Sequence, residues 1–157
     1  MEAQAFVGLK VLDFTRVIAG PLATEYLAQP GAIVVRVESA ESLDGLRISA
    51  PYKDGKVGVD RSGYFAEYNA NKYSISINLG HPKAAGVVMH LVKWCDVVTE
   101  NFRPGTMEKF GLTYQKLKEM KPDIIMLSSS NQGQTGPEAK TPGYGYSLCA
   151  LTGLTNM

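Results

Sequence analysis

The sequence predicts an α/β fold built on an open, mainly parallel sheet with helices on both faces. Residues 9–14 and 32–38 are short, apolar and rich in β-branched side chains, as buried parallel strands are. A helical segment, residues 22–28, lies between them and starts just after Pro21, a residue suited to a helix start. A strand, a helix and a strand within forty residues form a βαβ unit, which pairs its two strands in parallel.

Residues 39–62 form a polar stretch, which predicts a long surface excursion, and loops of this length are often functional. After it, strands and helices continue to alternate. The predicted elements that follow are an aromatic segment at residues 64–68, strands at 74–79, 96–99 and 123–129, a helix from Thr113 as N-cap to Met120, and a final helix at 146–154.

Residues 82–94 form the clearest predicted helix, because their apolar side chains recur at three- and four-residue steps. The predicted apolar stripe consists of Ala84, Val87, Val88, Leu91 and Cys95. His90 lies off this stripe and is expected to be solvated.

Composition excludes several classes of protein. The chain has 157 residues, 45% of them hydrophobic and 20% charged, as in ordinary globular domains. Sixteen basic and fifteen acidic residues leave a net charge of +1, so no basic face for nucleic acid or an anionic membrane is expected. Cys95 and Cys149 are too few for a disulfide scaffold or a zinc site, and both are expected to be buried thiols. With no leader-like N-terminus and no membrane-length apolar run, the sequence predicts a cytoplasmic protein without a metal.

Ligands of open α/β sheets bind outside the carboxyl ends of the strands. In this chain those ends are followed by the loops at residues 15–21, 39–62, 101–105 and 130–137. They bring together Arg16, Arg103 and Lys109, backbone amides at helix starts, and very few acids. This chemistry indicates an anionic, phosphate-bearing ligand, although residues 99–111 alone could also be an ordinary strand-to-helix loop.

Other ligand and enzyme classes lack their motifs. Residues 15–21 hold one glycine, Gly20, and not the G-x-G-x-x-G that binds dinucleotides, although Glu38 ends the second strand where a ribose-binding acid would stand. No P-loop and no G-x-S-x-G elbow occurs, and neither His81 nor His90 has an obvious serine or cysteine partner.

Five segments, in order, resemble segments of family III coenzyme A transferases, the group of formyl-CoA and carnitine CoA-transferases. The segments are residues 11–21, 31–38, 71–75, 100–111 and 134–137. The resemblance implies a Rossmann-like large domain and a homodimer of interlocked chains. It also implies transfer of CoA between carboxylic acids, with an aspartate nucleophile forming anhydride and thioester intermediates.

The resemblance also implies a set of CoA contacts. It assigns contacts to Ile18, Ala19, Asn101, Phe102, Arg103 and Lys109. Arg16, the cation of the first loop, is added to this set of predicted contacts. Arg103 and Lys109 would pair with phosphate groups. Where some members have an arginine after the second strand, this chain has Ser39.

The family's nucleophilic aspartate lies downstream of the segment that residues 146–154 match. The sequence therefore predicts that residues 1–157 are the CoA-binding N-terminal portion of the large domain, without the second domain and the C-terminal return segment, and inactive alone. Asp13 could substitute as nucleophile, but a structural role in tying down the first loop is the favoured interpretation.

Two alternatives remain at the level of sequence. One is a short non-catalytic protein that binds CoA or a nucleotide, or one subunit of a split enzyme. The other is an acyl-CoA racemase, which the residues disfavour because the histidine of that group aligns with Tyr144.

Overall fold

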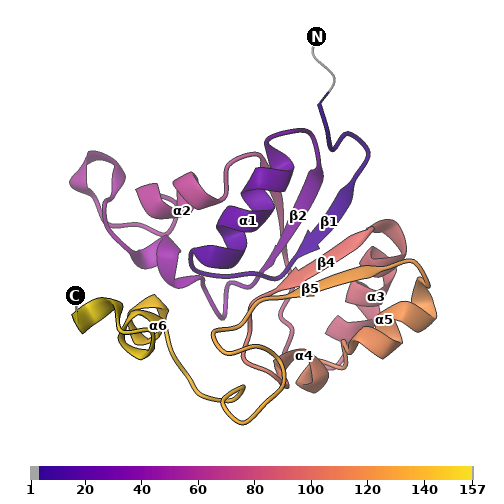
Figure 1. The fold of residues 1–157 in the computed structure, drawn as a ribbon. Coiled ribbons are helices and arrows are strands. Elements are labelled where there is room, and N and C mark those ends of the chain that lie inside the picture. The colour runs from indigo at the N-terminus through magenta and orange to yellow at the C-terminus, as the bar shows by residue number, and fades with distance from the viewer. Residues whose placement is uncertain (1–3, 157) are drawn as a thin grey trace.

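The computed structural model describes residues 4–156, which form one five-stranded sheet in the order β3-β2-β1-β4-β5 (Figure 1). Every neighbouring pair is parallel, so the predicted open parallel sheet is confirmed. The strands are β1 (Lys10–Asp13), β2 (Ile33–Glu38), β3 (Lys72–Ser76), β4 (Val97–Glu100) and β5 (Ile125–Ser128).

Helices cover both faces of the sheet, with α1 on one face and α3 and α5 on the other (Figure 1). The helices are α1 (Ala19–Ala28), α2 (Gly63–Tyr68), α3 (Ala84–Trp94), α4 (Thr106–Lys109), α5 (Tyr114–Met120) and α6 (Gly145–Leu151). Short 3-10 helices lie at Gly45–Ile48, Lys53–Gly55 and Leu154–Asn156.

Alternate residues of the central strands belong to two separate hydrophobic cores. Leu12 and Val98 face α3 and α5 and belong to the larger core, where Cys95 is fully buried and burial raises the pKa of its thiol to about 11. Val11 and Val34 point the other way and pack with α1 in the smaller core. Burial on both faces explains why the central strands are almost continuously apolar.

Three predicted details of α1, α3 and β3 were wrong. Helix α1 begins at Ala19, and Pro21 fits inside its first turn because N–H groups there have no helical partner. The buried stripe of α3 includes Val92, whereas Val87 is 49% exposed. Strand β3 starts at Lys72 and ends at Ser76, because β2 pairs with these residues over its last five positions.

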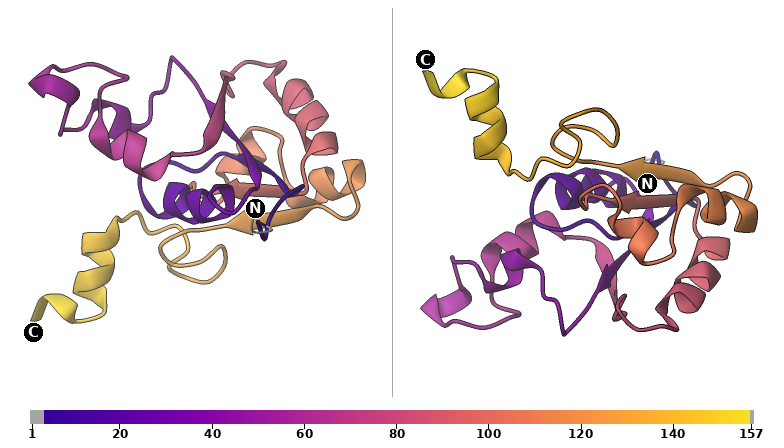
Figure 2. Two further views of the ribbon diagram at one scale, coloured as in Figure 1. Left: turned by 90° about the horizontal axis from the view of Figure 1, so that it is seen from above. Right: turned by 90° about the horizontal axis from the view of Figure 1, so that it is seen from below.

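The segment from α6 to residue 156 projects from the rest of the protein (Figures 1 and 2). Tyr146 and Leu151 are 89% and 68% exposed, and Cys149 is half-buried, so the expectation that both cysteines are buried was wrong for Cys149. Within residues 4–156, no helix has both the length and the apolar character needed to cross a membrane.

Candidate functional site

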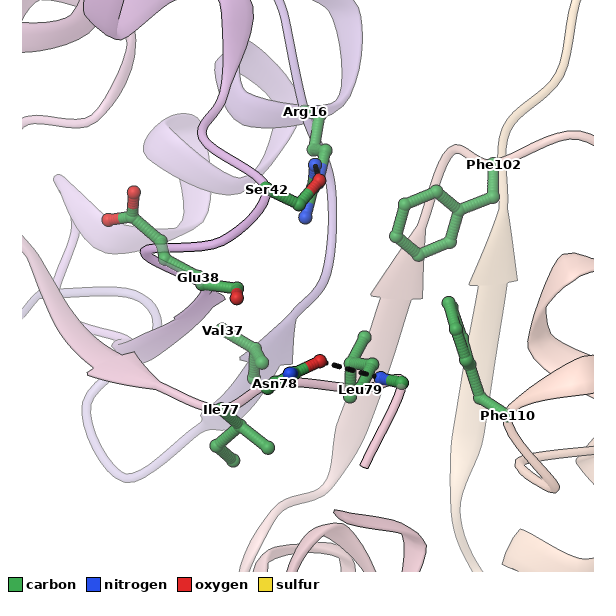
Figure 3. Close-up of a pocket in the computed structure, with 11 residues that line it drawn as sticks. Arg16, Val37, Glu38, Ser42, Ile77, Asn78, Leu79, Phe102 and Phe110 are labelled. Atoms are coloured by element: carbon green, nitrogen blue, oxygen red, sulfur yellow. Dashed lines mark hydrogen bonds between the residues drawn. The ribbon is translucent and has the colours of Figure 1, made fainter. Parts of the chain in front are cut away.

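A pocket of about 280 Å³ lies at the carboxyl edge of the sheet (Figure 3). The segments that follow four neighbouring strands line it. Arg16 comes from the end of β1, Ser39 and Ser42 follow β2, Asn78 follows β3, and Phe102 follows β4. Three of the four predicted loops, those after β1, β2 and β4, therefore meet at this pocket, whereas residues 130–137 are not among its lining residues.

The pocket combines an apolar wall with a cation. Phe102 and Phe110 meet edge to face with their ring centroids 6.1 Å apart, and Leu79 lies nearby (Figure 3). The Arg16 guanidinium lies 5.8 Å from the centroid of Phe102, and its Nη1 donates to Ser42 Oγ at 2.9 Å. A flat apolar wall beside a fixed cation suits an aromatic ring that carries an anionic group.

The carboxylate of Glu38 is engaged within the protein. Arg47 donates to its two oxygens at 2.7 and 2.8 Å, and Ser74 donates to Oε1 at 2.8 Å. Burial alone would raise the pKa of Glu38, but these hydrogen bonds and the nearby charge of Arg36 lower it. The carboxylate points away from the pocket (Figure 3), so Glu38 is not placed to bind a ribose as a dinucleotide-binding acid would.

Asp13 is a structural residue in this fold. It is fully buried, and it accepts hydrogen bonds from the Thr15 amide and hydroxyl at 2.8 and 2.6 Å, from Thr24 at 2.7 Å and from Thr99 at 3.0 Å. Lys72 Nζ lies 3.5 Å from Oδ2, and burial lowers the pKa of this lysine to about 8. The carboxylate fixes the start of the loop after β1 and has no open face for a substrate.

Glu100, at the end of β4, is also engaged. Its side chain is buried, and Oε2 accepts from the Phe102 amide at 2.7 Å. Burial raises the pKa of Glu100, and hydrogen bonds from Ser128 and Phe102 only partly offset this effect. Like Asp13 and Glu38, Glu100 supports the edge of the sheet and is not a free nucleophile.

The seven predicted contact residues divide into two groups. Arg16 and Phe102 line the pocket. The other five are not among its lining residues, namely Ile18, Ala19, Asn101, Arg103 and Lys109.

Each of these flanking residues has a definite setting. Ile18 and Ala19 are exposed at the start of α1, which no side chain caps. Asn101 binds the backbone of the loop after β1. Arg103 and Lys109 are exposed, and Arg103 Nη2 donates to the Lys140 carbonyl at 3.0 Å.

Sequence reasoning missed the segment of residues 77–80, Ser42 and Phe110, all of which line the pocket. The segment was assigned largely to a strand, and strand residues were not considered as ligand contacts. Since β3 ends at Ser76, residues 77–80 form a loop at the carboxyl edge. The Asn78-Leu79-Gly80 sequence, typical of a turn, was the available signal.

The chain belongs to CoA-transferase family III, whose model matches residues 6–157. Human succinyl-CoA:glutarate CoA-transferase is 39% identical to it over 150 residues, which are 96% of this chain and 33% of the human protein. Acetyl-CoA:oxalate CoA-transferase of Acetobacter aceti is 39% identical over 149 residues, 95% of this chain and 37% of that protein.

A solved structure agrees with the sequence comparisons. The crystal structure of a CAIB/BAIF family protein from Brucella suis matches with a TM-score of 0.88 and 33% identity, over 99% of this chain and 41% of that one. The chain thus spans about a third of the length of the curated relatives it matches.

Proposed function

We propose that residues 1–157 are the CoA-binding N-terminal portion of the large domain of a family III CoA-transferase. The observation that carries this proposal is the pocket formed by the ends of β1 to β4, with one cation, two aromatic rings and no free carboxylate among its described lining residues. Coenzyme A offers the complementary groups, an aromatic base and three phosphates.

The base would pack against Phe102 and Phe110, and the phosphate on the ribose would pair with Arg16 beside Ser42. The pyrophosphate would lie outside the pocket. There it would meet the amides at the start of α1, at Ile18 and Ala19, and the exposed cations Arg103 and Lys109. Six of the seven predicted residues would then contact one extended ligand, and Asn101 would act through the backbone of Arg16.

The reaction proposed for the whole enzyme is transfer of CoA between two carboxylic acids. An aspartate from a segment outside residues 1–157 would attack the thioester carbonyl, forming an anhydride and releasing the CoA thiolate. Asp13, Glu38 and Glu100 are each held inside the fold, which supports a binding role and not a nucleophilic one for this portion.

The relatives named above act on different acids, glutarate and oxalate, yet each is named for CoA transfer and each matches nearly all of this chain. This supports a shared CoA-binding role for residues 1–157, with the acid chosen elsewhere. We further propose that the complete enzyme is a cytoplasmic, interlocked homodimer without a metal, and that its partners are acyl-CoA and carboxylic acid substrates, with no nucleic acid or membrane.

Calorimetry with CoA and an acyl-exchange assay test the proposal on the 157-residue chain. We expect binding of CoA and no exchange between acyl-CoA and free acid. Lack of CoA binding would refute the binding role, and measurable exchange would refute the assignment of the nucleophile to another segment.

A second candidate is a self-sufficient binding protein or one subunit of a split enzyme. Ile125 on β5 and Leu151 on α6 are 61% and 68% exposed, and this apolar surface favours a chain that packs against further protein over a self-sufficient one. Size-exclusion chromatography tests the self-sufficient protein, which would remain monomeric alone and with CoA.

A further inference from the structure

Val17 adopts a backbone conformation that is rare for its residue type. Its φ is 66°, in the left-handed region, where a β-branched side chain is strained. Strain of this kind persists only where surrounding contacts enforce it, and it gathers at functional sites. Val17 directly precedes Ile18 and Ala19, the residues at the start of α1.

The Val17 amide is bound by the side chain of Asp44, twenty-seven residues further along the chain. The Val17 amide donates to the two carboxylate oxygens of Asp44, at 3.3 Å to Oδ1 and 3.1 Å to Oδ2. Asp44 is 3% exposed, although it belongs to the surface excursion at residues 39–62.

Asp44 is itself held rigidly. Its Oδ1 accepts from the Leu46 amide at 2.9 Å, and its Oδ2 accepts from Arg36 Nη2. Arg36 is 2% exposed and donates from Nη1 to Asn69 Oδ1 at 2.6 Å. The buried guanidinium neutralises the carboxylate, so Asp44 can stand beside an anion-binding loop with little repulsion of the anion.

A purely local role does not account for these bonds. As the N-cap of the 3-10 helix Gly45–Ile48, Asp44 needs only the bond from Leu46. The bonds to Val17 join a distant loop, and they fall at the one non-glycine residue between β1 and α1 that has a positive φ.

We propose that Asp44 is a positioning residue for CoA binding. It holds Val17 in its strained conformation, and this presets the free N–H groups at the start of α1 to receive a phosphate of the ligand. Such preorganisation increases affinity because the loop is ordered before the ligand arrives. The inference rests on the proposed function, since it concerns the same ligand.

The test measures CoA affinity and melting temperature for the wild type, Asp44→Asn, Val17→Gly and the double variant. We expect Asp44→Asn to weaken CoA binding about tenfold and to lower the melting temperature, because Arg36 loses its charged partner. Val17→Gly should bind within about twofold of the wild type, because glycine adopts a positive φ without strain.

The double variant separates positioning from stability. Val17→Gly should restore most of the affinity lost in Asp44→Asn but not the melting temperature, because the glycine relieves the loop and leaves Arg36 unpaired. A double variant that binds CoA no better than Asp44→Asn would overturn the inference, as would unchanged affinity in Asp44→Asn.

Two further measurements complete the test. Asp44→Glu replaces Asp44→Asn if that variant fails to fold, because it keeps a negative charge opposite Arg36. Its affinity for CoA should also fall, and adding Val17→Gly should restore it. An unchanged CoA affinity in Asp44→Glu would contradict the inference. Asp60→Asn is the matched control, because Asp60 lies in the same excursion, is 88% exposed and pairs only with Arg47 among the described residues. If the wild type itself does not bind CoA, the proposed function fails, whereas wild-type binding that Asp44 does not influence refutes only the positioning role.

Discussion

Asn101 and Arg16 hold each other through two hydrogen bonds that run in opposite directions. The Arg16 amide donates to Asn101 Oδ1 at 2.8 Å, and Asn101 Nδ2 donates to the Arg16 carbonyl at 2.8 Å. The pair joins the loops after β1 and β4, which are neighbours in the sheet although 85 residues separate them in sequence. The amide of Asn101 therefore shapes the site by fixing the backbone of Arg16.

Asn101→Asp tests this role. The aspartate can still accept from the Arg16 amide but cannot donate to its carbonyl, and it adds a negative charge beside the proposed anion site. We expect CoA affinity to fall about tenfold, with a loss of stability of about 1 kcal/mol for one hydrogen bond. Calorimetry and chemical denaturation measure the two effects, and a variant with wild-type affinity would contradict the assigned role.

Arg16→Ala tests the proposed contact of this residue with the phosphate on the ribose of CoA. Because Arg16 is the cation that lines the pocket, we expect the variant to lose affinity for CoA but to bind 3′-dephospho-CoA about as well as the wild type does. The expected loss for CoA is about tenfold or more, since a charge-assisted bond is removed. An equal loss for both ligands would show that Arg16 contacts another part of the molecule.

Arg103→Ala and Lys109→Ala test the flanking cations. Both residues are exposed and lie outside the pocket, so each should contribute through partly screened attraction to the pyrophosphate. We expect a loss of a few-fold to tenfold in affinity for CoA and for 3′-dephospho-CoA alike, and a smaller loss at high salt. Lys118→Ala, on the outer side of α5, is the control that should leave affinity unchanged.

The fold followed from the sequence because each central strand is apolar on both sides and each connection is long enough for a helix. Leu12 and Val11 show why, as they face opposite cores and both are fully buried. The limits of the edge strand β3 were harder to predict. They depend on pairing with β2, whereas the pattern of polar and apolar residues in β3 itself continues past Ser76.

The site was predicted in part, through the rule that loops gather at the carboxyl edge and through the resemblance to a family. Those arguments found Arg16 and Phe102, which line the pocket. They could not find the bonds of Asp44 to Val17, because that contact joins two loops whose relative position depends on the tertiary fold. They favoured a structural role for Asp13, which its burial and its four hydrogen bonds support.

Gly20→Ala tests how tightly the loop after β1 is packed. A Cβ at position 20 would lie 2.4 Å from Thr15 Cβ, a distance that forces the loop or the start of α1 to move. We expect a loss of about 1–3 kcal/mol in the free energy of unfolding, together with weaker CoA binding. Gly86→Ala is the matched control, because nothing lies within 4 Å of its added Cβ on α3, and it should stabilise the protein by about 0.5–1 kcal/mol. Equal stability of the two variants would contradict this packing.

Glu100→Gln tests the buried carboxylate beneath Phe102. Burial raises the pKa of Glu100 in the folded protein above its ordinary value of 4.5, so the folded state binds more protons than the unfolded state just above that pH. The free energy of unfolding of the wild type should therefore fall, relative to that of Glu100→Gln, as the pH rises from about 4.5 to 7.

Glutamine keeps an oxygen for the Phe102 amide and carries no charge, so the variant should be more stable than the wild type at pH 7. The difference should vanish below pH 4, where the wild-type carboxyl is protonated in both states. Urea denaturation at a series of pH values measures it, with Glu119→Gln on the exposed side of α5 as the control. A stability difference between Glu100→Gln and the wild type that is independent of pH would show that the carboxylate is not destabilised by burial.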